Sequence, residues 1–428
     1  MGLRQAALGL TAIGDHRPLT TSFGTSIAIH GLNVVTGVLL ARSLGPQGRG
    51  ELAAVMLWPG ILAAVGSVGV VEAITYHTAR ANASISTLLG TSISLCLVQS
   101  GVLVVSGIVL VSFVLTRYEP PTRHAAYLFL AYIPLYLLAM YLMAILNGMR
   151  RYSRFHGLRL LVIVTSAAGL VTLALTGRLT VTGATMVFLL AHAVALVASA
   201  AGLRTMRSGL KIERKVARSL LAFGFRSHSG NLTAMLNERL DQLLISILLA
   251  PTQLGLYVIA VTLTSLTALV GSSVSLVALP SIAELSPGPA RDQAIQRLVA
   301  STLIGSIAVT GPILLLLPWL IGTFFGRSFQ AATPAARILL VAAVALSTNR
   351  VLSAILRAVG RPLDAGWAEL LALAVTAVGL VALLPAFGLI GAAITSLLAY
   401  TASMGWVTVR ARAALGVPAW SLYLPRRS

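Results

Sequence analysis

The sequence predicts an all-α polytopic membrane protein with about twelve transmembrane helices, arranged as two six-helix lobes around a central cavity. The first reason is composition: 57% of the 428 residues are hydrophobic and only 10% are charged. Soluble domains carry about 25% charged residues, so this chain is too apolar to fold as one. The second reason is an internal repeat that relates the two halves of the chain.

A helix that crosses a bilayer needs about 20 consecutive, mainly apolar residues. The chain offers twelve such runs, at 23–44, 52–76, 86–115, 125–147, 157–177, 180–203, 221–249, 255–279, 298–325, 335–356, 365–384 and 388–409. Cytoplasmic loops of membrane proteins are enriched in Lys and Arg. Most of the 31 basic residues fall in loops of one side if both termini are cytoplasmic, so we expect that orientation.

The repeat is carried by three matches in the same order. LGPQGRG at 44–50 aligns with LAPTQLG at 249–255, which pairs Pro46 with Pro251 and Gly50 with Gly255. AIL recurs at 144 and 354, and GlyAla followed by LeuLeuAla recurs at 183–191 and 391–399. Because six spans separate equivalent points, the halves have the same orientation and form a parallel repeat about an axis along the membrane normal.

This repeat sets the expected domain organisation. We expect an N-terminal lobe at 1–203, a basic cytoplasmic linker at 204–218, a C-terminal lobe at 219–410 and a cytoplasmic tail at 411–428. Two such lobes are typical of transporters that bind substrate between them near the middle of the membrane. A scaffold protein that arose by duplication is the alternative.

The seventh span contains an unusual polar segment, MLNERLDQLL at 235–244. An ionisable side chain at mid-membrane costs roughly 2.5 to 3.5 kcal/mol on insertion scales, so such residues usually face a bundle interior or a cavity. If the seventh span is one continuous helix, its polar residues form a stripe on one face. The repeat maps this stripe onto the first span, where the equivalent residues are less polar. The stripes comprise His228, Asn231, Glu238 and Gln242, with Asp241 beside them, and His30 and Asn33 in the first span.

We interpret these stripes as cavity walls. The alternative is that Arg239 pairs locally with Glu238 or Asp241 and only holds helices together. Arg350, preceded by Asn349, is the most isolated cation in any span, and we expect it to have a partner. The remaining carboxylates at membrane depth are Glu72 and Glu369, and for Glu369 we favour a position near the span end.

Several function classes are excluded by what the sequence lacks. Neither of its two lysines lies in a GxxxxGK(S/T) phosphate-binding loop, and the catalytic motifs HExxH and GxSxG are missing. The single cysteine, Cys96, cannot form a Cys-rich metal site. Topology explains the basic loops, so nucleic acid is not an expected partner. We expect no enzyme activity, no catalytic residues, no metal and no cofactor.

Five segments resemble the polysaccharide flippases of the multidrug/oligosaccharidyl-lipid/polysaccharide superfamily, whose fold is MATE-like. They are LLARSLGPQGRGELA at 39–53, GVVEA at 69–73, NERLDQLLI at 237–245, LGLYVIAV at 254–261 and FGLIGAA at 387–393. The resemblance runs from about residue 20 to 410. It implies that the chain flips an undecaprenyl-pyrophosphate-linked oligosaccharide from the inner to the outer leaflet of the bacterial cytoplasmic (inner) membrane, by alternating access, for surface polysaccharide biosynthesis.

The resemblance also implies roles for particular residues. A cationic cavity would receive the anionic headgroup, with Arg239 and Arg350 as its cations and Arg226 attracting the pyrophosphate first. Glu238, Asp241 and Glu72 are candidates for coupling to a proton or Na⁺. The expected partners are the lipid-linked oligosaccharide, membrane lipids, and a polysaccharide polymerase or glycosyltransferases; a monomer is compatible with the architecture. The competing function is a cation-coupled multidrug exporter of the same fold.

Overall fold

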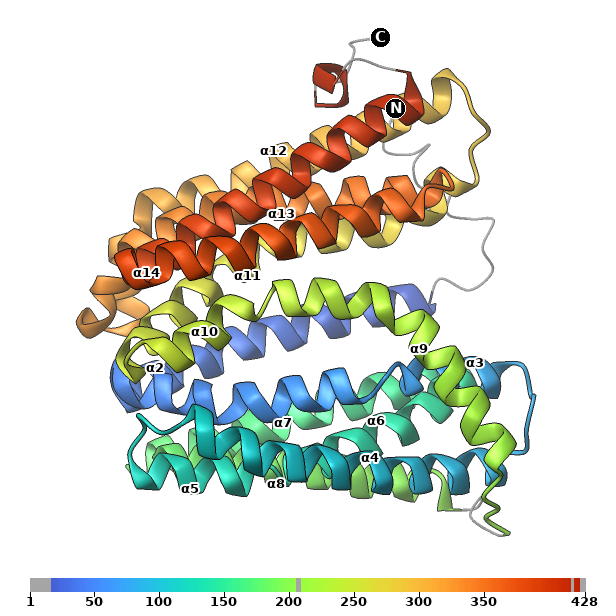
Figure 1. The fold of residues 1–428 in the computed structure, drawn as a ribbon, viewed down its shortest axis with the longest axis vertical. Coiled ribbons are helices and arrows are strands. Elements are labelled where there is room, and N and C mark those ends of the chain that lie inside the picture. The colour runs from blue at the N-terminus through green and yellow to red at the C-terminus, as the bar shows by residue number, and fades with distance from the viewer. Residues whose placement is uncertain (1–16, 205–208, 417–418, 424–428) are drawn as a thin grey trace. The chain divides into compact units, whose positions relative to one another are not determined.

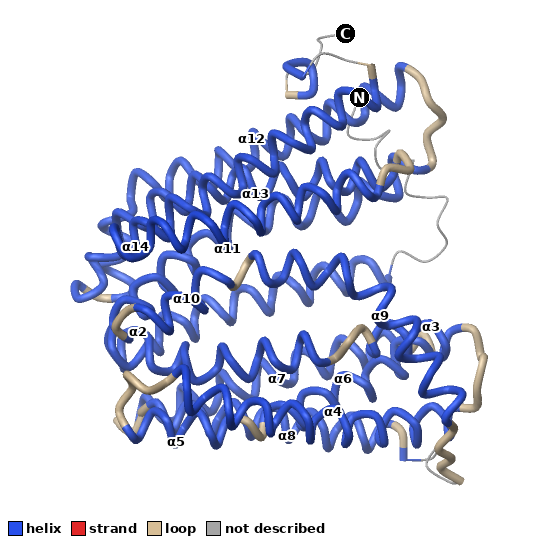
Figure 2. The backbone as a smooth tube through the Cα atoms, in the orientation of Figure 1, coloured by secondary structure: helices blue, strands red, loops and turns tan. Residues whose placement is uncertain are grey.

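The computed structural model describes residues 17–204, 209–416 and 419–423, and all the regular structure in these residues is helical (Figures 1 and 2). The N-terminal half contains α2 (Arg17–Gly66), α3 (Val70–Ala79), α4 (Ile85–Val114), α5 (Pro120–Phe129), α6 (Tyr132–Gly148), α7 (Tyr152–Leu175) and α8 (Val181–Gly202). The C-terminal half contains α9 (Arg214–Asn237), α10 (Leu240–Leu248), α11 (Pro251–Ala283), α12 (Pro289–Leu320), α13 (Thr333–Ala358) and α14 (Pro362–Leu415). Short helices η2 (Ile321–Phe325) and η3 (Arg327–Ala332) join α12 to α13, and η4 (Ala419–Leu422) follows α14.

Each of the twelve predicted spans falls on these helices, but the span at 52–76 is interrupted between α2 and α3 and the span at 125–147 between α5 and α6. Two pairs of consecutive spans are joined without a loop, because α2 and α14 continue through a kink at one glycine each. Gly45 in α2 has φ 66° and Gly388 in α14 has φ 55°, a backbone region that residues with a Cβ rarely adopt. The predicted helical membrane fold is therefore confirmed, with spans one and two, and eleven and twelve, linked by these kinks.

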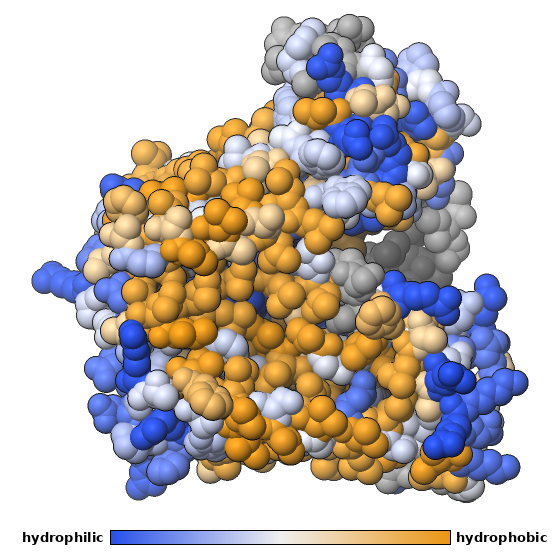
Figure 3. Space-filling model, in the orientation of Figure 1, coloured by the Kyte–Doolittle hydropathy of each residue, from blue (hydrophilic) through white to orange (hydrophobic). Residues whose placement is uncertain are grey.

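Length and hydropathy support membrane crossing. Nine helices of the described residues are long and apolar enough to span a bilayer. On α4, side chains such as Leu97, Val102 and Phe113 are 63% to 75% exposed, as expected of a helix that contacts lipid. Over the helices labelled α4, α5 and α8, hydrophobic side chains cover the middle of the face drawn in Figure 3, and hydrophilic ones lie toward both ends.

The chain divides into two compact units. Unit 1 comprises Met1–Thr36, Pro59–Leu110 and Ala125–His228, and unit 2 comprises Gly37–Trp58, Val111–His124 and Ser229–Ser428. The core of unit 1 forms where α3, α4 and α6 pack, and there the Tyr141 hydroxyl donates a 2.6 Å hydrogen bond to Gln99. The core of unit 2 lies among α11, α12, α13 and α14, and it positions the polar residues described next.

Candidate functional site in unit 2

The polar segment of the seventh span contains a helix break. α9 ends at Asn237 and α10 begins at Leu240, so Glu238 and Arg239 lie in a turn. The prediction of one continuous helix over 221–249 is wrong at this point. Discontinuous helices in transporters leave backbone groups and charged side chains free to contact a substrate or ion. The break separates Glu238, which is exposed, from Asp241 and Gln242, which are buried on α10.

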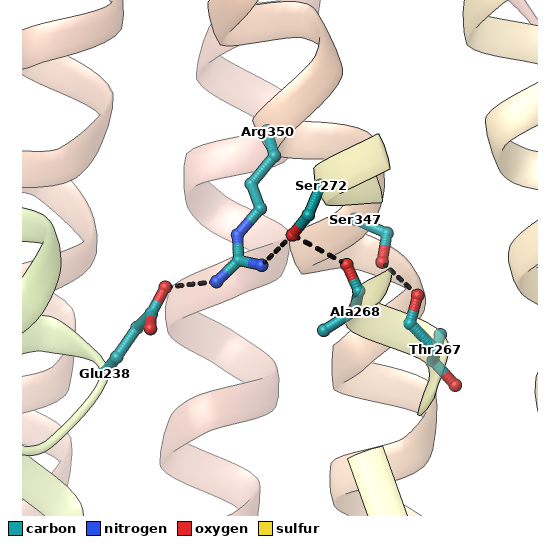
Figure 4. A network of polar contacts seen from close by, with 6 residues as sticks. All are labelled: Glu238, Thr267, Ala268, Ser272, Ser347 and Arg350. Atoms are coloured by element: carbon teal, nitrogen blue, oxygen red, sulfur yellow. Dashed lines mark hydrogen bonds and ion pairs between the residues drawn. The ribbon is translucent and has the colours of Figure 1, made fainter. Parts of the chain in front are cut away.

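A close approach between α11 and α13 places the partners of Glu238. A side chain at Gly271 would collide with the backbone of Ser347, so the two helices can pack this tightly only because residue 271 is glycine. The Ser347 hydroxyl donates to the Thr267 carbonyl at 3.0 Å, which joins the helices by a hydrogen bond. One turn further on, Ser272 of α11 therefore lies beside Arg350 of α13 (Figure 4).

Arg350 connects three elements. Its Nη1 donates to the Ser272 hydroxyl at 2.8 Å, and its Nη2 donates to the Glu238 carboxylate in an ion pair (Figure 4). The Ser272 hydroxyl in turn donates to the Ala268 carbonyl at 2.9 Å, which orients its oxygen toward the guanidinium. The expectation that Arg350 has a partner is confirmed. The side chains of Arg350 and Glu238 are 27% and 43% exposed, so this pair is accessible from outside the core.

A second carboxylate interacts electrostatically with this guanidinium. Glu369 of α14 interacts with Arg350, Arg357 and Glu238, and its carboxylate contacts the side chain of Asn349. Asn349 is 2% exposed, and its Oδ1 has no hydrogen-bond partner among the described residues. Two carboxylates, Glu238 and Glu369, thus interact with two arginines, Arg350 and Arg357, near a buried amide that retains an unused acceptor.

Asp241 forms a separate, fully buried group. The Tyr257 hydroxyl donates to Asp241 Oδ2 at 2.6 Å, and the backbone N–H of Gln242 donates to Oδ1 at 2.6 Å. The hydroxyl of Ser396 on α14 lies 3.5 Å from that of Tyr257. These contacts join α10, α11 and α14. Hydrogen bonds of this kind stabilise a buried carboxylate, which would otherwise be costly to remove from water.

The other predicted site residues are dispersed. Arg239 is exposed, and its Nη1 donates to Gln242 at 3.4 Å rather than pairing with Glu238. Arg226 of α9 is exposed in unit 1, and its Nε donates to the Ala222 carbonyl at 3.0 Å. Asn33 of α2 and Glu72 of α3 are exposed in unit 1. The side chains of His30, His228 and Asn231 lie outside the described residues.

Sequence reasoning missed the neutral partners of these charges. Ser272, Tyr257 and Ser396 each contact a charged side chain or its partner, but hydroxyl residues are common in spans and give no distinct signal. Tyr257 had one usable cue, because it lies inside LGLYVIAV, a segment already singled out by its resemblance. Among the described residues, no cluster of three or more His, Cys, Asp or Glu is arranged to hold a metal ion.

Comparison with solved structures identifies the fold. The fold is similar to "Lipid II flippase MurJ, inward closed conformation", with a TM-score of 0.74 and 14% identity over 94% of this chain and 89% of that one. It is also similar to an inward-facing multidrug resistance MATE family transporter of the MOP superfamily, with a TM-score of 0.68 and 16% identity over 90% and 95%. A MOP superfamily transporter from Pyrococcus furiosus matches with a TM-score of 0.51 and 17% identity over 94% and 95%. The fold is thus that of MATE-like membrane transporters.

Sequence comparison then gives the family. The family model described as "Polysaccharide biosynthesis protein" matches residues 39–334, more than half of the chain, and the chain belongs to this family. No curated protein sequence matches it. The solved structures that share its fold include a flippase and a multidrug resistance transporter. The protein is a multi-pass membrane protein of this family with a MATE-like fold.

Proposed function

We propose that the protein flips an undecaprenyl-pyrophosphate-linked oligosaccharide from the inner to the outer leaflet of the bacterial cytoplasmic membrane. The observation that carries the proposal is the accessible Arg350, a guanidinium within a membrane-spanning helix whose anionic partner, Glu238, is itself 43% exposed. Guanidinium groups bind phosphate oxygens through paired hydrogen bonds, which would replace part of the hydration of a pyrophosphate. Membership of the polysaccharide biosynthesis family supports a lipid-linked sugar as the cargo.

In this mechanism the pyrophosphate displaces the Glu238 carboxylate and takes its place beside the Arg350 guanidinium. Arg239, exposed at the helix break, would supply a second positive charge, and Arg226 would attract the headgroup earlier. Movement of an anion out of a negative cytoplasm releases roughly 2.3 kcal/mol per charge per 100 mV of membrane potential. Both termini would be cytoplasmic, and the polymerase and glycosyltransferases that make and use the lipid-linked sugar would be functional partners.

The carboxylates favour a second candidate, a cation-coupled multidrug exporter. Glu238 pairs with Arg350, and Glu369 interacts electrostatically with both Arg350 and Arg357, so this region holds two carboxylates as well as two guanidinium groups. Such a site would suit a cationic amphiphile if Arg350 remained paired with one carboxylate.

One experiment separates the two candidates. A deletion strain is assayed for surface polysaccharide and for accumulated lipid-linked oligosaccharide, then complemented with wild type, Arg350→Ala or Arg239→Ala. Loss of surface polymer, accumulation of the lipid-linked sugar and rescue by wild type alone would support the flippase. Intact surface polymer together with new sensitivity to cationic dyes would overturn it in favour of the exporter.

A further inference from the structure

Unit 1 contains a groove that combines arginines with an apolar floor. It has a volume of about 690 Å³ and lies between α7 and α8, at the N-terminal end of α7 and the C-terminal end of α8. Arg151, Arg154 and Arg204 line its rim, and Leu158 and Leu161 belong to its apolar wall. None of the three arginines forms a salt bridge within the described residues.

The charge around this groove is not compensated nearby. The described residues of unit 1 contain only two carboxylates, Glu72 and Glu213. Glu213 accepts from the Thr87 hydroxyl at 3.5 Å, and neither carboxylate lines the groove. The first turn of α7 has no acidic residue and no side-chain cap, so its positive dipole end adds to the three guanidinium groups.

The position of the groove indicates what occupies it. α7 packs chiefly against α6 and α8, and only 11% of its most apolar 18-residue window is buried, so the outer side of the α7–α8 pair faces lipid. A ligand of the groove must present negative charge at the rim and an alkyl chain along the leucines. Those are the properties of a phospholipid with an anionic headgroup.

We propose that the α7–α8 groove is a binding site for one anionic phospholipid of the leaflet at this end of the helices, with its phosphate at Arg151, Arg154 and Arg204 and one acyl chain along Leu158 and Leu161. This inference goes beyond the proposed function, because it concerns a membrane lipid and needs only that the chain spans the membrane. It assigns the groove arginines a role in holding unit 1 at the lipid headgroups.

Gly157 allows the apolar part to be tested separately from the charge. A Cβ added at Gly157 meets nothing within 4 Å, so Gly157→Leu would extend into the open groove without a collision. Leucine also favours a helix over glycine, so the variant should fold. Ala201→Leu is a second groove variant, since Ala201 is exposed and lines the same groove. The matched control is Gly101→Leu on α4, where a Cβ likewise meets nothing within 4 Å.

The experiment is native mass spectrometry of the purified full chain, titrated with phosphatidylglycerol or with phosphatidylcholine of the same acyl chains. We expect one phosphatidylglycerol to bind wild type more tightly than phosphatidylcholine. Replacing all three rim arginines with Gln should weaken binding by on the order of 100-fold, given about 1 kcal/mol per basic residue near an anionic surface. Gly157→Leu and Ala201→Leu should weaken it as well, whereas Gly101→Leu should not.

The charge control is Arg178→Gln, which removes an exposed arginine from the loop at the other end of the α7–α8 pair. Equal weakening by Arg178→Gln would overturn the proposal, because it would mean general attraction without a site. Equal binding of phosphatidylcholine would overturn it too. Displacement of the bound lipid by inorganic phosphate at matching concentration would also contradict it, since the acyl chain would then contribute nothing. Melting temperatures of all variants confirm that each is folded.

Discussion

Gly50 and Gly255, which the internal repeat pairs with each other, lie against one another in unit 2. A Cβ on Gly50 would meet the carbonyl of Pro251 and lie 2.8 Å from the amide nitrogen of Gly255. A Cβ on Gly255 would meet the carbonyl of Pro46 and lie 2.9 Å from the amide nitrogen of Gly50. The contact is reciprocal, as expected of equivalent residues related by local two-fold symmetry. A repeat recognised from sequence letters is therefore also a packing contact, made backbone to backbone.

This contact predicts that alanine is not tolerated at either position. Gly255→Ala and Gly50→Ala should each destabilise the protein by about 1–3 kcal/mol or more, because the colliding atoms are backbone and cannot rotate away. Gly60→Ala in the same helix α2 is the control, since a Cβ there meets nothing within 4 Å. Thermal unfolding of detergent-purified variants measures the difference. Equal melting temperatures for all three would show that the helices do not approach this closely.

The ion pair between Arg350 and Glu238 should matter for transport but contribute little to stability. Because their side chains are 27% and 43% exposed, the pair should contribute less than about 1 kcal/mol to stability. Arg350→Ala should therefore fold with a nearly unchanged melting temperature and yet lose transport. Arg350→Lys should recover part of the activity, because it keeps the charge but not the paired donors. A large loss of stability would instead support the alternative in which the charges only hold helices together.

The control for that experiment is Arg337→Ala, which removes an exposed arginine from the N-terminal part of the same helix, α13. It should retain transport in the complementation assay. If Arg337→Ala fails as completely as Arg350→Ala, the site cannot be assigned to Arg350.

The sequence was sufficient to predict the helical membrane fold, because long apolar runs leave the chain few alternatives in a bilayer. The isolation of Arg350 likewise predicted a partner. The break after Asn237 could not be predicted, since NERL contains no proline or glycine and the turn depends on tertiary contacts. The interaction of Glu369 with Arg350 and Arg357 could not be predicted either, because it depends on the packing of α13 against α14.

Tyr257 and Asp241 predict a stability effect that differs from that of the exposed pair. Tyr257→Phe removes the hydroxyl that donates to Asp241 Oδ2 at 2.6 Å and leaves a buried carboxylate oxygen without this donor. The cost should be about 1–3 kcal/mol in the free energy of unfolding. Tyr127→Phe is the control, because Tyr127 is 36% exposed. The double variant Tyr257→Phe/Asp241→Asn should recover part of the loss, and no recovery would argue against a direct interaction.

Asp364 predicts a structural role for charge at the two ends of α14. Its carboxylate accepts from Arg361 at 2.6 Å and from Arg410 at 2.9 Å, and its backbone carbonyl accepts from Trp406 at 3.1 Å. The segments before and after the Gly388 kink are thereby joined. Asp364→Asn should lower the free energy of unfolding by about 1–2 kcal/mol, a value reduced by the partial exposure of both arginines. Chemical denaturation in detergent measures this loss.

The control for Asp364 is Asp292→Asn, which removes a carboxylate that forms no salt bridge within the described residues. Asp292 lies in the first turn of α12, so only a favourable helix-dipole interaction of a few tenths of a kcal/mol should be lost. A loss at Asp292→Asn as large as that at Asp364→Asn would contradict the bridging role.

Ion coupling, which we propose for the acidic residues, is testable at the same positions. Glu238 is exposed beside Arg350, so it can exchange a proton or Na⁺ when an anionic substrate takes the arginine, whereas Asp241 is buried with its oxygens already hydrogen-bonded. We therefore expect Glu238→Gln to abolish the response of transport to an imposed proton or Na⁺ gradient in proteoliposomes. Asp241→Asn should mainly reduce the amount of folded protein. Glu72→Gln in unit 1 is the third candidate, and its exposed position in the first turn of α3 predicts a small effect. If both Glu238→Gln and Asp241→Asn keep full transport that still depends on the gradient, these carboxylates do not couple an ion. The remaining driving force is then the membrane potential acting on the anionic cargo.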